Sequence, residues 1–186
     1  MSNHGTFSGN PKTEWLVNAS EEDRDMRLLE DFDYTDPDGR VWPAPKDSIV
    51  NGASIPRPLW STVGSPYTDD YRRASVVHDV ACNTPGVNRK KADQMFYHAC
   101  RAGGCSLVQA RMLYAGVRIG AWASTSLPKA SISKETLLFR SLLDAPSVEA
   151  VFLKGKLSEI SAAMESLPED ASFDQLDRVI DFYIQF

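Results

Sequence analysis

The chain has 186 residues, of which 42% are hydrophobic, and a formal net charge of -5. This length can bury a core as one domain or as a domain with a helical appendage. The acidic balance disfavours a nucleic-acid partner. No apolar run approaches the roughly 20 residues that span a bilayer, and the polar N-terminus lacks the apolar core of a signal peptide. We therefore expect synthesis in the cytoplasm, with any export left to a dedicated secretion system or a phage particle.

The N-terminal part of the chain predicts a β-hairpin. Residues 1–13 show no periodicity and are expected to form a loose tail or strap. Apolar and polar residues alternate imperfectly over residues 26–34, which predicts one strand. In the turn that follows, Pro37 and Gly39 hold the positions that suit a type I turn. A second strand over residues 40–42 completes the hairpin, and the prolines of residues 43–45 end it.

Residues 51–60, Asn-Gly-Ala-Ser-Ile-Pro-Arg-Pro-Leu-Trp, are the first informative motif. Gly52 permits an unusual backbone turn, and the small residues beside it leave carbonyl and amide groups open to a ligand. Pro56 and Pro58 hold the next segment extended until Trp60 can pack. A structural loop, whose tryptophan only fills the core, is the alternative and stays open.

Residues 71–98 carry the candidate chemistry and predict two helices joined by a tight turn. Residues 83–86, Asn-Thr-Pro-Gly, break the helical pattern, and Asn88 is a good N-cap for the second helix. So short a connection makes the helices antiparallel neighbours. His78 and Asp93 are equally far from the midpoint of the turn, so they should meet. About 6 Å of rise separates each from its end of the loop, which predicts a pair near a rim of the fold.

The His78–Asp93 pair has the composition of a catalytic dyad. A carboxylate fixes the tautomer of an imidazole and stabilises its imidazolium, as a general base requires. A structural hydrogen bond between the helices is the alternative. Asp79 is rotated by about 100° around the same helix, so it must face elsewhere, and a bound cation is one candidate partner. His98 lies about 140° round the second helix from Asp93, which disfavours a two-metal phosphohydrolase.

The rest of the chain predicts packing helices. Gly103 and Gly104 end the second helix, Ser106 caps a third, and an apolar face recurs along it at helical spacing. The expected fold is mainly α (α+β): a three-helix core with an N-terminal β-hairpin and a C-terminal helical extension. The three cysteines, Cys82, Cys100 and Cys105, lack Cys-x-x-Cys spacing, so we expect buried thiols.

The polar stretch of residues 124–133 is the expected domain boundary. It separates a core domain, residues 1–123, from a helical extension, residues 124–186. We assign the short amphipathic helices of the extension to packing or to a protein partner. Three residues are expected to break them: Pro146, Gly155 and Pro168.

Five basic residues cluster near the helical hairpin: Arg72, Arg73, Arg89, Lys90 and Lys91. A solvated face is the default interpretation of such charges. Contact with an anionic lipid headgroup or a phosphate is the functional interpretation.

The central stretch, roughly residues 41–122, resembles a family of uncharacterised domains found in bacteriophages and bacteria. The resemblance rests on motifs in a fixed order and spacing. They are Asn-Gly-Ala-Ser-Ile-Pro at 51–56, His-Asp at 78–79, Arg89 with Ala-Asp at 92–93 and Phe96, and Met-Leu-Tyr-Ala-Gly-Val-Arg at 112–118 with Gly120.

The same residues are similar, more distantly, to the phospholipase A₂ superfamily, in which a His-Asp pair and an Ala-Asp on antiparallel helices form the catalytic centre. The resemblance implies that His78 activates water as the general base, that Asp93 orients it, and that Asp79 binds calcium. Calcium would polarise the ester carbonyl and stabilise the oxyanion. The remaining implied calcium ligands come from the loop: Asn51, Gly52 and Ser54.

Three further residues, Trp60, Arg89 and Tyr97, are assigned to substrate contact or support of the site. Two positions depart from the family patterns. The phage family usually has Asp where this chain has Asn51, and both groups commonly place Tyr where it has Cys82. An altered substrate or a decayed site would follow from these changes.

Three hypotheses follow for the function. The first is a calcium-dependent hydrolase of esters, above all phospholipids at a membrane surface, delivered as a phage component or an antibacterial effector. The second is a non-catalytic phage accessory or assembly protein that binds a protein partner through its C-terminal helices. The third is a hydrolase of another bond, such as one in peptidoglycan, that uses the same base.

Overall fold

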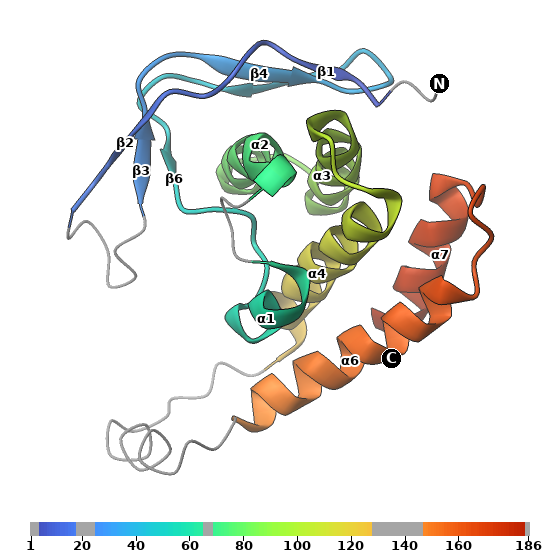
Figure 1. Cartoon of the computed structure of the whole chain (residues 1–186). Coiled ribbons are helices and arrows are strands. Elements are labelled where there is room, and N and C mark those ends of the chain that lie inside the picture. Colours follow the sequence, from blue (N-terminus) through green and yellow to red (C-terminus); the bar gives the residue numbers. More distant parts are fainter. Residues whose placement is uncertain (1–3, 18–24, 65–68, 128–146, 185–186) are drawn as a thin grey trace, which may run out of the picture.

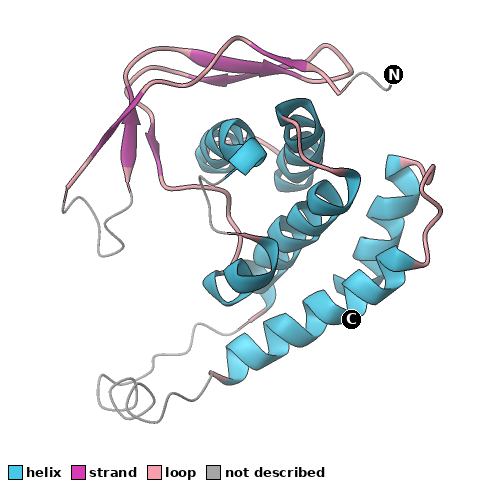
Figure 2. Ribbon diagram, viewed as in Figure 1, coloured by secondary structure: helices cyan, strands magenta, loops and turns pink. Residues whose placement is uncertain are grey.

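The computed structural model describes residues 4–17, 25–64, 69–127 and 147–184 (Figure 1). They form a mixed α+β fold in which helices predominate, as the sequence predicts (Figure 2). The elements are β1 (Thr6–Phe7), β2 (Thr13–Trp15), β3 (Met26–Leu28), β4 (Phe32–Thr35), β5 (Val41–Ala44), β6 (Ile49–Val50), α1 (Trp60–Val63), α2 (Arg72–Asn83), α3 (Arg89–Gly103), α4 (Leu107–Ser126), α6 (Val148–Glu165) and α7 (Phe173–Ile184). Within the described ranges, no helix is both long and apolar enough to cross a membrane.

Of two three-stranded antiparallel sheets, the one in the order β1–β4–β5 lies over α2 and α3, and the one in the order β2–β3–β6 flanks α2 (Figure 1). The predicted hairpin is confirmed as β4 and β5, which pair in the register Tyr34 with Trp42. Asp36 fixes its turn, because the Asp36 carboxylate accepts the backbone N–H groups of Asp38 and Arg40 and the indole N–H of Trp42. Alternate residues of both strands face the core.

Three details of the predicted N-terminal part are wrong. The expected strand over residues 26–34 is two strands, β3 and β4, in different sheets, and the imperfect alternation marks the break between them. The expected loose tail or strap contains β1, where Thr6 and Phe7 pair with β4. Strand β5 also continues through Pro43, which is tolerated because β5 is an edge strand.

The predicted helical hairpin is confirmed as α2 and α3. The Asn88 side chain accepts the N–H of Lys91 and so caps α3, and Ser106 caps α4 in the same way through Gln109. Gly104 ends α3 in the left-handed conformation that only glycine adopts readily, with a φ of +116°. Helix α3 packs against both α2 and α4 (Figure 1).

Helices α6 and α7 pack against α4 on the side away from the sheets (Figure 1). Their buried residues join the same hydrophobic cluster as the rest of the core. The predicted break at Gly155 is wrong, because α6 runs without interruption through that residue. Of the expected polar linker, residues 124–126 belong to α4, and residues 128–133 lie outside the described ranges together with Pro146 and the chain between them.

Two glycines of α4 let the loop of residues 51–56 approach the helix. A Cβ added at Gly120 would lie 2.3 Å from the carbonyl oxygen of Ser54. At Gly116 it would lie 3.3 Å from a methyl group of Ile55. The loop therefore lies between α4 and α2, next to the candidate site.

We expect Gly120→Ala to lower the free energy of unfolding by about 1–3 kcal/mol, because the new methyl group meets backbone that cannot yield cheaply. Urea denaturation followed by circular dichroism measures the change. Gly155→Ala is the matched control: its Cβ meets open space, so the variant should gain roughly 0.5–1 kcal/mol of helix stability. Equal stabilities for Gly120→Ala and the wild type would contradict this close packing.

Candidate functional site

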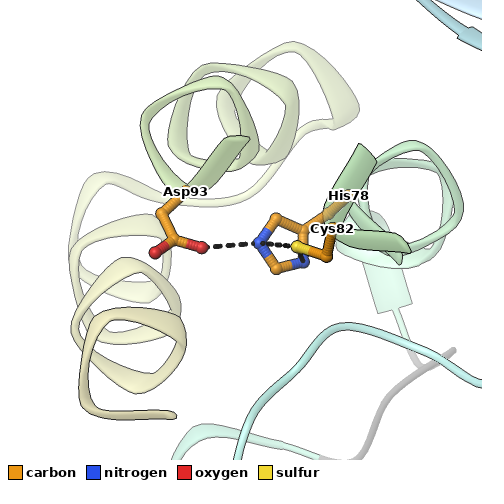
Figure 3. Close-up of side chains that lie close together, drawn as sticks. All are labelled: His78, Cys82 and Asp93. Carbon is orange, nitrogen blue, oxygen red and sulfur yellow. Dashed lines mark hydrogen bonds and ion pairs between the residues drawn. The ribbon is translucent and has the colours of Figure 1, made fainter. Parts of the chain in front are cut away.

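The turn between α2 and α3 brings His78 and Asp93 together, as the sequence predicts (Figure 3). The Nε2–H of His78 donates to Oδ1 of Asp93 over 2.8 Å. The predicted position near a rim is wrong, because neither side chain has any exposed surface. The sheets cover α2 on one side and α4 packs against α3 on another, so the open end expected for a bare hairpin is closed.

Asp93 has two further partners, both arginines. Nε of Arg89, one helical turn earlier on α3, donates to the same carboxylate oxygen over 3.1 Å. Arg118 of α4 donates to the other oxygen over 3.4 Å. The predicted support from Arg89 is therefore a direct contact, whereas Arg118 was not predicted as a site residue. Its only sequence signal was its place in the motif of residues 112–118.

The ion pairs continue from Asp93 into the C-terminal helix α7. Arg118 also donates to Asp181 over 2.8 Å. Lys90 lies 3.0 Å from Asp177 and also pairs with Asp181. Sequence reasoning saw no site residues in the C-terminal part, although the spacing of four residues between these two aspartates places them on one face of a helix.

Cys82 is the third member of the buried cluster. Its Sγ lies 3.4 Å from Nε2 and 3.8 Å from Nδ1 of His78, over the imidazole ring (Figure 3). Among the described residues, His78, Cys82 and Asp93 form the one group of three that could hold a metal ion. Two guanidinium groups already neutralise Asp93, which opposes a further cation there. Cys82 is half-buried, so it is the member of the group that reaches solvent.

The surroundings of His78 favour its protonated form. Burial lowers the pKa of the imidazole, but the negative charge that Cys82 and Asp93 can carry outweighs it and raises the pKa from 6.5 to about 9. Phe96 packs against the ring, with centroids 4.7 Å apart, and so keeps it in place. The contacts with Cys82 and Asp93 therefore favour the imidazolium form of His78.

This pair should make stability depend on pH. Between pH 6.5 and about 9 the folded state holds a proton on His78 that the unfolded chain does not, so the free energy of unfolding should fall as the pH rises. The loss is on the order of 3 kcal/mol across this window. Urea denaturation at pH 6.5, 8 and 9.5 measures it. His78→Asn should abolish most of the slope, and an equal slope in that variant would assign the effect to other groups.

Asp79 faces away from the dyad, as predicted, and holds the loop. Its Oδ2 accepts the backbone N–H of Asn51 over 2.6 Å, and the Asn83 amide donates to its Oδ1 over 3.3 Å. Calcium takes roughly six to eight oxygen ligands. The groups that these bonds bring to Asp79 are donors, and the carbonyl of Ser54 packs against Gly120. Of the implied calcium ligands, Asn51 and Asp79 are in direct contact, through a hydrogen bond that the Asn51 backbone donates.

The other predicted support residues, Trp60 and Tyr97, contact groups outside the dyad. The Trp60 indole donates to the carbonyl of Ile55 over 2.9 Å and closes the loop on itself. Tyr97 packs in an aromatic cluster with His98 and His4. Nδ1 of His98 lies 3.2 Å from Nδ1 of His4. His98 therefore does not join Asp93, in agreement with its predicted position on the helix.

Residues 26–117, just under half of the chain, match the family described as "Protein of unknown function (DUF1353)". This range begins at β3, ends within α4, and includes the loop, His78, Cys82 and Asp93. The match confirms the predicted resemblance to a domain of unknown function. It assigns no activity to these residues.

Two relatives come from Sinorhizobium fredii (strain NBRC 101917 / NGR234), and both are described as uncharacterised. The chain is 37% identical to the protein y4jT over 114 residues, which are 59% of this chain and 32% of that protein. It is 38% identical to the protein y4iH over 96 residues, which are 51% of this chain and 40% of that protein. The matches thus span less than half the length of these relatives. No solved structure matches the chain significantly.

Proposed function

We propose that the chain is a hydrolase of carboxylic esters, with phospholipids as its substrates, in which His78 and Asp93 move the proton. The observation that carries the proposal is the 2.8 Å bond between a buried imidazole and a buried carboxylate on antiparallel helices. The similarity of the surrounding motifs to the phospholipase A₂ superfamily supports the choice of substrate.

The dyad leaves one imidazole nitrogen for chemistry. Nε2 of His78 is bonded to Asp93, and Nδ1 lies on the other side of the ring (Figure 3). In its neutral form, Nδ1 takes a proton from water as the water attacks the ester carbonyl. The ester C–O bond then breaks, and the imidazolium returns the proton to the leaving alkoxide. Asp93 remains a carboxylate throughout and stabilises the imidazolium, while Arg89 and Arg118 fix its orientation.

Access to Nδ1 sets the direction from which water and substrate arrive. His78 has no exposed surface, whereas Cys82, 3.8 Å from Nδ1, is half-buried. The side chain of Cys82 therefore marks the entrance. Its small volume, where related families commonly have tyrosine, leaves room for a substrate at that point.

We expect His78→Gln and Asp93→Asn to lower kcat/KM for fatty-acid release from mixed phospholipid vesicles by about 10²–10⁴-fold. The wild-type rate should rise tenfold per pH unit and level off above about pH 9, because only neutral His78 acts as the base. His98→Gln is the matched control and should keep the activity, since that ring lies outside the dyad. Equal release by the wild type and His78→Gln would refute the proposal.

The proposed mechanism does not use calcium. The carboxylate of Asp79 instead accepts a hydrogen bond from the backbone of Asn51 and so holds the loop of residues 51–56 in place. We therefore expect the same hydrolysis rate in calcium and in EDTA. Calorimetry with calcium on the wild type and Asp79→Asn is the parallel measurement. A calcium-dependent rate, with binding that disappears in Asp79→Asn, would instead establish the calcium site implied by the resemblance.

A non-catalytic role is the second candidate. It is favoured by the ion pairs of Asp93 with Arg89 and Arg118, which would stabilise a helical scaffold whether or not a substrate binds. In that case no vesicle hydrolysis is measured at any pH, and His78→Gln changes only stability. A protein partner bound through the C-terminal helices would then be the activity to seek.

A further inference from the structure

A cavity of about 400 Å³ lies where α3, α4 and α7 meet. Arg89 and Lys90 reach it from α3, Arg118 from α4, and Ile184 from the end of α7. Among the described residues that line it, three are cationic and none is acidic. The cavity adjoins the candidate site, because Arg89 and Arg118 both contact Asp93.

Both arginines that line this cavity have hydrogen-bond donors without a partner among the described residues. Arg89 uses only Nε, on Asp93, so both terminal nitrogens of its guanidinium lack a partner among the described residues. Nε of Arg118 is buried without a partner in the same part of the structure. The side chain of Arg89 is 35% exposed, so its terminal nitrogens are open to solvent, where an anion can accept their hydrogen bonds. Buried donors are normally satisfied, so the buried Nε of Arg118 indicates a missing acceptor.

The cationic residues of the cavity belong to a network of ion pairs. Arg89, Lys90 and Arg118 are balanced by three carboxylates, those of Asp93, Asp177 and Asp181. The side chains of Arg89 and Lys90 are 35% and 39% exposed, so an anion that enters the cavity from solvent can also reach their charges.

We propose that this cavity binds a phosphate group. The planar guanidinium of Arg89 can donate two parallel bonds to phosphate oxygens, and Lys90 adds a point charge. Trp122 and Ile184 give the cavity an apolar wall, which suits a phosphate that carries an organic group. The site does not depend on the proposed hydrolysis. Where both hold, it anchors the phosphate of the substrate next to the dyad.

Titration of the whole chain with inorganic phosphate, followed by calorimetry at pH 7 and low ionic strength, tests the site. We expect binding to the wild type and a loss of about tenfold or more in Arg89→Gln. Arg178→Gln removes the same charge from an exposed position that does not line the cavity, so it should bind like the wild type. No binding to the wild type, or equal binding to all three proteins, would overturn the proposal.

A second variant separates the cavity from the ion pairs. Ala121→Leu places two methyl groups at the cavity wall and leaves every charged residue unchanged, so it should also lose phosphate binding. Circular dichroism checks that both variants are folded, and retained binding in folded Ala121→Leu would refute the location. Vesicles of phosphatidylglycerol distinguish the source of the phosphate. Binding to vesicles that Ala121→Leu abolishes would assign a lipid headgroup, and binding of phosphate alone would assign a soluble ligand.

Discussion

The buried carboxylate of Asp93 is the constraint on which the rest of this structure depends. A charge without exposed surface is tolerated only when hydrogen-bond donors surround it. The donors here come from three helices: His78 from α2, Arg89 from α3 and Arg118 from α4. The relative positions of these helices are therefore fixed by one group as well as by the apolar core. Removal of any one of these donors would leave the buried carboxylate of Asp93 with one hydrogen bond fewer.

The same bond links stability to proton chemistry. Cys82 and Asp93 together favour the proton on His78, which strengthens the folded state but removes the base that hydrolysis requires. A site of this kind becomes active only as the proton leaves, and it loses stability over the same pH range. Arg89 and Arg118 compete with His78 for the charge of Asp93, so the proposed phosphate ligand, which would draw on these arginines, would also act on the proton of the dyad.

Several parts of the fold were predictable from local pattern. The turn at Asp36, the caps at Asn88 and Ser106, and the breaks at Gly86 and Gly104 follow from the conformations and donors of single residues. The encounter of His78 with Asp93 followed from counting residues on either side of a short turn. The expected break at Gly155 failed because burial of the residues around it outweighs the weak helix propensity of one glycine.

The sequence by itself determined the hairpin of α2 and α3 and the pair that it brings together, since these depend on short-range geometry. Only the tertiary structure decided that the pair is buried, that Arg118 joins it, and that Asp177 and Asp181 of α7 complete the charge balance. These contacts join residues far apart in the chain. No local pattern specifies such a contact, because it arises from the packing of α4 against α3 and of α7 against α4.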